Sequence, residues 1–280
     1  MLDSQRAKRS LVSDLLTYAL LVAAILIWAF PVLWVGITSI KPRTEIFTNP
    51  PTLVFQPTLD HYREALNARG IVGSIWNSAI VTVASTVLAL VLAVPAAYAF
   101  ARLRFRFKRH LSFYTLFMQM APPIGLLIPY FFAFNRLRLL DTYLGLIIIY
   151  LTFTLPFSVW IMITYFQDVP PELEEAAAVD GASRFGAFLR IVLPQVGGGV
   201  AVTAIFAFIN AWTEFLYAVV LTGRDTQTAT VAIFGFLGAS ESRWGPFTAT
   251  GTMIMAPVVV VALVAQKQIV RGLSLGGVKG

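Results

Sequence analysis

The segment PPELEEAAAVDGASRFGAFLRIVLP, residues 170–194, is the longest stretch of mixed polar and charged character in the second half of a mostly apolar chain. Its first half is acidic and rich in alanine, and a glycine interrupts it at position 181. Long apolar stretches flank it on both sides. The segment is therefore a short polar piece between parts of the chain that suit a lipid environment.

The composition indicates a membrane protein, because 58% of the 280 residues are hydrophobic and only 12% are charged, whereas soluble domains carry about 25% charged residues. A helix needs roughly 20 residues to cross the apolar part of a bilayer. Longer runs without any charged residue cover 15–40, 71–101, 111–134, 142–167 and 245–266. A sixth run, 191–223, is interrupted only by Glu214. The sequence therefore predicts an all-α membrane protein with six transmembrane helices.

The remaining segments follow from this assignment. They are an N-terminal segment 1–14, an outer loop 41–70, a core 71–266 that contains spans two to six and a polar loop 168–190, and a tail 267–280. Lysine and arginine concentrate on the cytoplasmic side of membrane proteins, and their densest cluster is ARLRFRFKRH, residues 101–110. We therefore expect both termini and the polar loop in the cytoplasm.

The net charge of +7 is explained by a basic rim that faces anionic lipid headgroups. The lipid bilayer is therefore an expected partner, and nucleic acid is not.

Residues that carry catalytic chemistry are scarce. The chain has no cysteine, and its two histidines, His61 and His110, have no metal-ligand or acid/base companion at helical spacing. Neither a GxSxG elbow nor a GxxxxGK[ST] phosphate loop occurs. We expect no catalytic residue, no metal site and no bound cofactor, and we do not expect this chain to hydrolyse ATP itself.

Residues 170–194 carry the signals of a short helix followed by a turn. Two prolines precede Glu172, Glu174 and Glu175, which fall in the first turn, where acidic side chains are favourable. Asp180 and Gly181 end the helix, because glycine readily adopts the left-handed conformation used at helix C-termini. Ser183 can then cap the next piece.

Beyond Ser183, an apolar stripe is predicted on one helical face, formed by Phe185, Phe188, Leu189 and Val192. Such a pattern also fits an elbow lying on the lipid surface. The acidic start disfavours that alternative, because anionic headgroups repel carboxylates. Contact with another protein is the better interpretation.

Glu214 is the acidic residue well inside a predicted span, within FINAWTEFLYA. Charged groups inside a membrane are costly and usually functional. Asn210, Trp212 and Glu214 are therefore candidates for the lining of a transport path. A carboxylate satisfied by neighbouring helices or water is an equally good explanation of Glu214.

The stretch EAAAVDGASRFGAFLRIVLP, 175–194, resembles the cytoplasmic EAA loop of permease subunits of binding-protein-dependent ABC importers. The matching positions are Glu175, Ala176, Ala177, Asp180, Gly181, Ala182, Ile191, Leu193 and Pro194. The resemblance extends to 77–102, to WTEF at 212–215 and to the ending QKQIVRGLSLGGVKG. Together these stretches are similar to the maltose-type carbohydrate permeases over nearly the whole chain.

The resemblance implies a type I ABC importer permease fold with a cytoplasmic coupling helix. It implies that the EAA loop docks on a separate ATPase dimer, which uses ATP and Mg, through Glu174, Glu175, Ala176, Ala177, Asp180, Gly181 and Ala182. It further implies a second homologous permease, an extracytoplasmic sugar-binding protein and a location in a bacterial or archaeal plasma (inner) membrane. The expected function is a non-catalytic permease subunit of an ATP-driven sugar importer.

Two alternatives stay open. The same machinery can import another solute, such as glycerol phosphate or a polyol. A stand-alone secondary carrier would leave the acidic loop unexplained.

Overall fold

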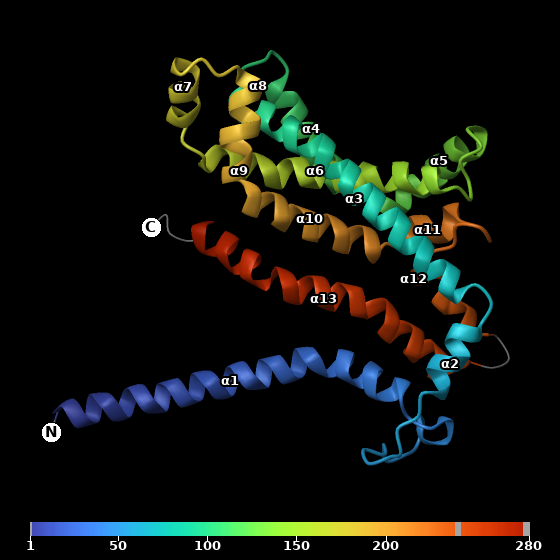
Figure 1. Ribbon diagram of the computed structural model, residues 1–280. Helices are drawn as coiled ribbons and strands as arrows, with labels where there is room; N and C mark the ends of the chain where they lie inside the picture. Colours follow the sequence, from blue (N-terminus) through green and yellow to red (C-terminus); the bar gives the residue numbers. More distant parts are fainter. Residues whose placement is uncertain (1, 239–241, 277–280) are drawn as a thin grey trace. The chain divides into compact units, whose positions relative to one another are not determined.

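The computed structural model describes residues 2–238 and 242–276, and these residues form helices and no strand (Figure 1). The elements are α1 (Leu2–Ser39), η1 (Arg43–Glu45), α2 (Asp60–Asn67), α3 (Ile71–Arg102), α4 (Lys108–Met120), α5 (Pro123–Arg136), α6 (Tyr143–Asp168), α7 (Glu172–Val179), α8 (Arg184–Ala187), η2 (Phe188–Val192), α9 (Leu193–Gln195), α10 (Gly197–Trp212), α11 (Leu216–Leu221), α12 (Ala229–Ala232), η3 (Ile233–Phe236) and α13 (Trp244–Gly276).

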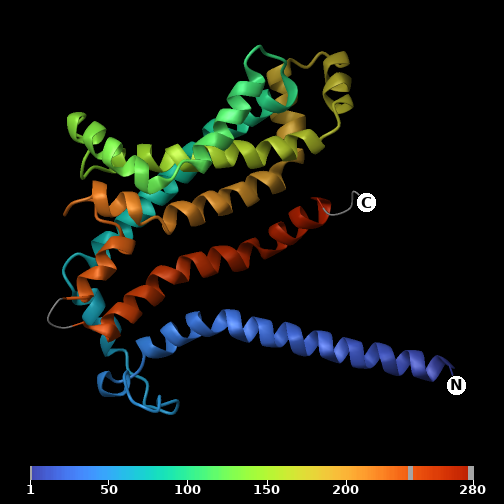
Figure 2. The same cartoon turned by 180° about the vertical axis from the view of Figure 1, so that it is seen from behind.

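The chain divides into two compact units. The first comprises Met1–Ala68 and Gly235–Met253, and the second comprises Arg69–Phe234 and Ile254–Gly280. In the second unit α3, α6 and α10 pack on one another and lie side by side (Figure 2). Ala89, Ala93 and Ala97 follow one another at four-residue spacing on α3 and are completely buried. Small side chains at this spacing let two membrane helices approach closely, so the sequence of α3 favours this packing.

Among the residues that the structure describes, four helices are long and apolar enough to cross a membrane, namely those over Ser13–Ser39, Ile71–Arg102, Tyr143–Asp168 and Trp244–Gln266. The number rises to six if each of two bent helix pairs counts as one span. The predicted six spans agree with this higher number.

The predicted span 111–134 is a bent pair, because α4 and α5 meet at 98° around Ala121 and Pro122. Pro122 and Pro123 lack backbone N–H groups, so the helix cannot continue through them without losing hydrogen bonds. The run 111–134 was predicted as one span, and the structure divides it into two helices at this bend.

The predicted span 191–223 is also interrupted. Its first residues belong to η2 and α9, and the helices over Arg184–Gln195 and Gly197–Trp212 meet at 74°. A second break at Thr213 separates α10 from α11. Pro194 and the three glycines that follow Val196 favour the first break, because glycine weakens a helix and proline cannot donate to it.

In the first unit, the predicted outer loop 41–70 contains η1 and α2. Lys41 is 1% exposed, and its Nζ lies 5.1 Å from the ring centroid of Trp34 and 5.5 Å from that of Phe55. The His61 Nε2 donates to the Lys41 carbonyl oxygen at 2.8 Å. These contacts hold the beginning of the loop against the end of α1.

The two ends of the chain differ from the expected segments in one respect. α1 begins at Leu2, within the predicted N-terminal segment 1–14, and α13 continues to Gly276, within the predicted tail 267–280. The last four positions of that tail lie outside the described residues.

Candidate functional site

The predicted coupling helix is α7, an eight-residue helix with Glu172, Glu174 and Glu175 in its first turn. Its end is a hydrogen-bonded turn in which the Ala182 N–H donates to the Ala177 carbonyl and the Gly181 N–H to the Ala178 carbonyl. This pattern is the Schellman motif, which needs a residue in the left-handed region, and Gly181 has φ +84°. The predicted turn at Gly181 is confirmed.

The piece after the turn begins as predicted, because the Ser183 side chain accepts a hydrogen bond from the Gly186 N–H at 3.1 Å. The predicted apolar stripe is partly wrong. Phe188 and Val192 are buried, whereas Phe185 is 69% and Leu189 44% exposed. The segment η2 is a π-helix, whose i→i+5 bonding changes the angular spacing of side chains. The stripe was predicted with α-helical spacing, which does not hold for Leu189 within η2, whereas Phe185 lies in α8, before the π-helix.

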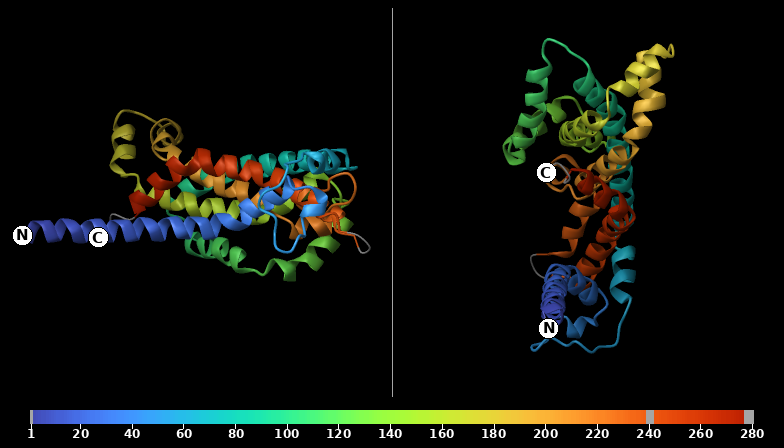
Figure 3. Two further views of the ribbon diagram at one scale, coloured as in Figure 1. Left: turned by 90° about the horizontal axis from the view of Figure 1, so that it is seen from below. Right: turned by 90° about the vertical axis from the view of Figure 1, so that its left-hand side faces the viewer.

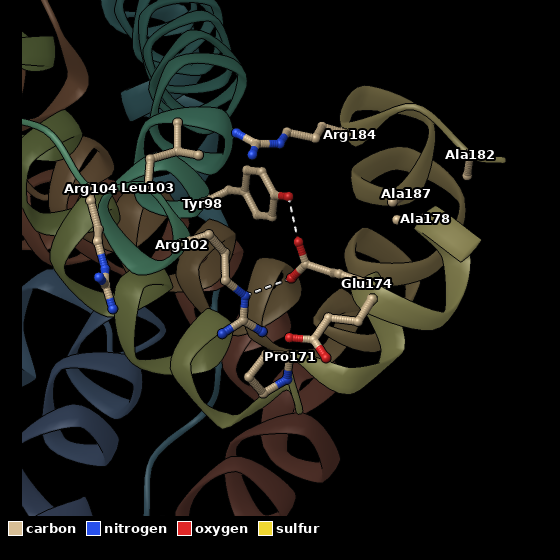
Figure 4. Close-up of a pocket in the computed structure, with 11 residues that line it drawn as sticks. Tyr98, Arg102, Leu103, Arg104, Pro171, Glu174, Ala178, Ala182, Arg184 and Ala187 are labelled. Carbon is tan, nitrogen blue, oxygen red and sulfur yellow. Dashed lines mark hydrogen bonds and ion pairs between the residues drawn. The ribbon is translucent and has the colours of Figure 1, made fainter. Parts of the chain in front are cut away.

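The two adjacent glutamates of α7 have different surroundings. Glu175 is exposed, whereas the Glu174 side chain is 18% exposed and forms an ion pair with Arg102. The Arg102 Nε donates to Glu174 Oε1 at 2.6 Å, and the Tyr98 hydroxyl donates to Glu174 Oε2 at 2.6 Å (Figure 4). Arg102 also donates through Nη2 to the Val169 carbonyl. Both carboxylate oxygens of Glu174 are thus bound inside this chain.

The ring of Tyr98 packs between two aromatic side chains that lie before and after α7 in sequence. Its centroid is 5.7 Å from that of Phe166 on α6 and 4.7 Å from that of Phe188 in η2. Val169 and Val192 belong to the same buried cluster. The two segments that flank α7 therefore meet at Tyr98.

A cleft of about 560 Å³ lies between α7, α8 and the end of α3. It is lined by Tyr98, Arg102, Leu103, Arg104, Pro171, Glu174, Glu175, Ala178, Ala182, Arg184 and Ala187. In Figure 4 the Arg184 side chain points from α8 across this cleft toward Tyr98. The cleft carries charged side chains of both signs.

The other predicted coupling residues have mixed exposure. Ala176, Asp180, Gly181 and Ala182 are exposed, and Ala177 is 5% exposed. In the left view of Figure 3, α7 turns away from the line of α6. Most of the EAA pattern therefore lies on an accessible surface, and its role in coupling stays a prediction.

Glu214 lies in the break between α10 and α11. Its carboxylate accepts hydrogen bonds from the N–H groups of Tyr217 at 2.8 Å and Ala218 at 3.0 Å. These N–H groups belong to the first turn of α11 and have no partner within the helix. The buried Tyr150 side chain faces the same carboxylate. Glu214 therefore has the local structural role that the sequence left as one of two explanations.

Glu214 also lines a cavity of about 300 Å³ in the second unit. The other lining residues are Met118, Gln119, Ala121, Pro123, Leu126, Tyr130, Thr152, Phe153, Leu216 and Tyr217. The rings of Phe153 and Tyr217 are stacked with centroids 6.0 Å apart. An aromatic cavity with a few polar groups is typical of a small-molecule site.

The other two predicted path residues do not line this cavity. Trp212 is 5% exposed, and its Nε1 donates to the Ile254 carbonyl at 2.9 Å. Asn210 is exposed on α10. Of the three path candidates, the structure brings Glu214 alone to the wall of this cavity.

Asp141 was missed by sequence reasoning. It adopts a left-handed conformation with φ 53°, and its carboxylate accepts hydrogen bonds from the N–H groups of Gly223, Asp225 and Thr226 and from the Thr226 hydroxyl. Partial burial raises the pKa of Asp141, but these hydrogen bonds outweigh that effect and lower the pKa below its ordinary value. The sequence signal that could have identified Asp141 is its position as a single aspartate between two apolar runs.

Within the described residues, no group of three histidine, aspartate or glutamate side chains is arranged to hold a metal ion.

Comparison with known proteins gives the family. Residues 85–275 match the family described as binding-protein-dependent transport system inner membrane component. The trehalose transport system permease protein SugB of Mycobacterium tuberculosis (strain CDC 1551 / Oshkosh) is 38% identical over 256 residues, which cover 89% of this chain and 92% of that protein. The trehalose/maltose transport system permease protein MalG of Thermococcus litoralis is 34% identical and covers 93% and 96%.

A solved structure shows the same fold. One chain of a bacterial ABC transporter involved in the import of the acidic polysaccharide alginate superposes with a TM-score of 0.75 at 24% identity, covering 91% of this chain and 96% of that chain. The fold is therefore that of a type I ABC importer permease. This chain belongs to the family of inner membrane components of binding-protein-dependent transport systems, and it is a multi-pass ABC transporter permease.

Proposed function

We propose that this chain forms half of the translocation path of an ATP-driven sugar importer and that α7 docks on a separate ATPase subunit. The observation that carries the proposal is the exposed, acidic face of α7 at Glu175, on a helix whose other side is fixed to the body of the protein through Glu174. A docking helix must present one face to its partner and transmit force through the other. The EAA pattern supplies the first face, and the ion pair supplies the second.

The proposal fixes an orientation. α7 and the basic segment 101–110 lie on the cytoplasmic side, together with both termini, because the ATPase must work where ATP is available and lysine and arginine concentrate on that side. ATP and Mg are used by the ATPase dimer. A second permease completes the path, and an extracytoplasmic binding protein delivers the solute, as the family description supports.

The proposed solute is a neutral sugar. None of the described residues that line the cavity at Glu214 is lysine or arginine, so this cavity lacks the cations that a phosphate ester would require. A carboxylate can accept hydrogen bonds from sugar hydroxyls, and a phenol hydroxyl can donate or accept them. The stacked rings of Phe153 and Tyr217 offer an apolar face. The trehalose and maltose permeases among the relatives support this solute class. The lack of lysine and arginine at the cavity disfavours glycerol phosphate as the solute. Membership of a binding-protein-dependent family disfavours a stand-alone carrier.

The test is purification of this chain from its native membrane in mild detergent, with identification of co-purifying proteins and an ATPase assay on the product. For Glu175→Lys we expect normal insertion but at least about a tenfold loss of recovered ATPase, because a like charge placed against a cationic docking surface costs several kcal/mol. The matched control is Asp60→Lys, since Asp60 is also exposed and also lies in the first turn of an eight-residue helix.

Recovery of an ATPase and a second permease, with the ATPase lost in Glu175→Lys and retained in Asp60→Lys, supports the proposal. Equal recovery of the ATPase with the wild-type chain and with Glu175→Lys would refute the docking role of α7.

A further inference from the structure

Two consecutive glutamates on α7 point to different environments. Glu175 is exposed beside the cleft, and Glu174 is turned toward α3, where its side chain is 18% exposed. Successive residues of an α-helix differ by about 100° in direction, because one turn contains 3.6 residues. A helix can therefore use one glutamate for an external partner and the next for an internal one.

The internal contact connects α7 to a helix that is distant in sequence. The chain itself joins α7 to α6 through residues 169–171 and to α10 through residues 180–196. α3 ends at Arg102, and residues 103–171 separate it from α7. α7 packs on α8 and η2, and toward α3 it is linked by the long side chains of Tyr98, Arg102 and Glu174.

This linkage is directional. Tyr98 and Arg102 lie four residues apart on α3 and therefore share one face, and each binds a different oxygen of Glu174. Arg102 is 14% exposed and also donates to the carbonyl of Val169, the first residue of the link between α6 and α7. Hydrogen bonds to both carboxylate oxygens fix the direction of the side chain as well as its distance. Apolar packing alone would leave the two helices free to slide.

We propose that Tyr98, Arg102 and Glu174 fasten α7 to α3, so that α3 moves together with α7 when the ATPase displaces it. The inference rests on the proposed docking of an ATPase on α7. These three are positioning residues, since they touch neither solute nor nucleotide. They extend the coupling machinery from the exposed loop to the helix that packs most closely on α6. The competing explanation is that these contacts only stabilise the folded loop and do not transmit the displacement of α7 to α3.

The experiment measures a distance across the cleft in the assembled transporter. Spin labels are attached through Leu103→Cys at the end of α3 and Ala178→Cys on α7, both of which line the cleft. This chain has no cysteine of its own, and the other subunits are made cysteine-free. The label-to-label distance is recorded without nucleotide and with ATP under conditions that block hydrolysis, in the wild-type background, in Glu174→Gln and in Tyr98→Phe.

We expect the distance to be the same in both states in the wild-type background and to change on ATP binding in Glu174→Gln. Solute uptake per ATP hydrolysed should fall about tenfold in Glu174→Gln, while the amount of recovered ATPase stays unchanged. Tyr98→Phe keeps the ring between Phe166 and Phe188 and removes one hydrogen bond, so it should show a smaller effect of the same kind.

A wild-type distance that changes between the two states would overturn the inference, as would unchanged uptake per ATP in both variants. If Glu174→Gln does not assemble, Tyr98→Phe decides, and failure of both to assemble would assign the cluster to folding alone. Failure of the proposed function is distinguishable, because in that case Glu175→Lys retains the ATPase.

Discussion

Glu174 and Glu214 are both largely enclosed carboxylates, but their partners differ. Glu174 binds side chains from α3, and its partner Arg102 is 72 residues away in the sequence. Glu174 therefore connects separate elements of the fold. Glu214 binds backbone N–H groups three and four residues ahead, and it stabilises the start of the helix that follows it. An ion pair between distant elements can transmit a displacement, whereas a carboxylate that caps its own helix break acts locally.

This difference suits the two residues to the different tasks proposed for them. Glu174 has no oxygen left without a protein partner in the cluster with Tyr98 and Arg102. Glu214 lines a cavity, and its hydrogen bonds to backbone N–H groups hold its carboxylate in place. A solute-binding carboxylate must be fixed in direction and still reachable, and a backbone cap meets both requirements.

The comparison is tested most strongly at Glu174. Glu174→Lys places a second cation beside Arg102 in a site where both side chains are less than a fifth exposed. Breaking a buried ion pair costs about 3 kcal/mol or more, so the free energy of unfolding of the purified chain in detergent should fall by that amount.

The control is Glu175→Lys, which changes the same charge at an exposed position and should alter the free energy of unfolding by less than about 0.5 kcal/mol. If both variants lowered the free energy of unfolding equally, the ion pair between Glu174 and Arg102 would not be the cause of the destabilisation.

A second test concerns the local role of Glu214. Glu214→Ala removes the acceptor for two N–H groups of α11 and should cost about 1 to 2 kcal/mol. Glu214→Gln retains one carbonyl acceptor and should cost less in stability while still lowering the affinity for the solute, because it removes the charge at the cavity wall. Equilibrium unfolding and solute binding to the purified transporter measure the two effects.

The matched control for this test is Asn210→Ala, since Asn210 is exposed and does not line the cavity. If Asn210→Ala reduces solute binding more than Glu214→Gln does, the cavity at Glu214 is not the solute site.

The smallest effect is expected at a third carboxylate, Asp141, which combines the two arrangements because it binds backbone N–H groups from a distant loop. Its folded-state pKa is lowered, so its contribution to stability is fully present above the unfolded-state pKa and is lost as the pH falls through the folded-state pKa. Asp141→Asn should remove this acid-side dependence and cost no more than about 1 kcal/mol at neutral pH, because solvent screens a partly exposed charge.

Thermal unfolding at a series of pH values below neutrality measures this effect. Wild-type chain and Asp141→Asn with identical pH dependence would contradict the assignment. Asparagine is the suitable replacement, because it tolerates the left-handed conformation observed at this position.

Much of the fold could be predicted from the sequence, because long uncharged runs have few structural alternatives in a membrane. The turn at Gly181 and the cap at Ser183 were also predictable, since each depends on one residue type and a few neighbours. The bend between α4 and α5 was not, because a proline marks where a helix weakens but does not set the angle that tertiary packing selects.

The site was less predictable for a related reason. The family pattern identified α7, but it could not separate Glu174 from Glu175, because both are acidic and both lie in the first turn. Their roles depend on the direction of α7 relative to Arg102, which is a property of the tertiary structure. Trp212 was expected in the path because it shares a stretch with Glu214, but it is the last residue of α10 and its Nε1 donates to the Ile254 carbonyl, whereas Glu214 lies beyond the end of that helix.

The π-helix η2 has a consequence for protein engineering. A π-turn contains one residue more than an α-turn, and one residue corresponds to about 100° of rotation. Replacing the π-turn within Phe188–Val192 by an α-helical turn with the same number of residues would therefore rotate everything beyond it relative to α7. Chimeras that exchange coupling segments between permeases must match the number of residues across η2 as well as the motif.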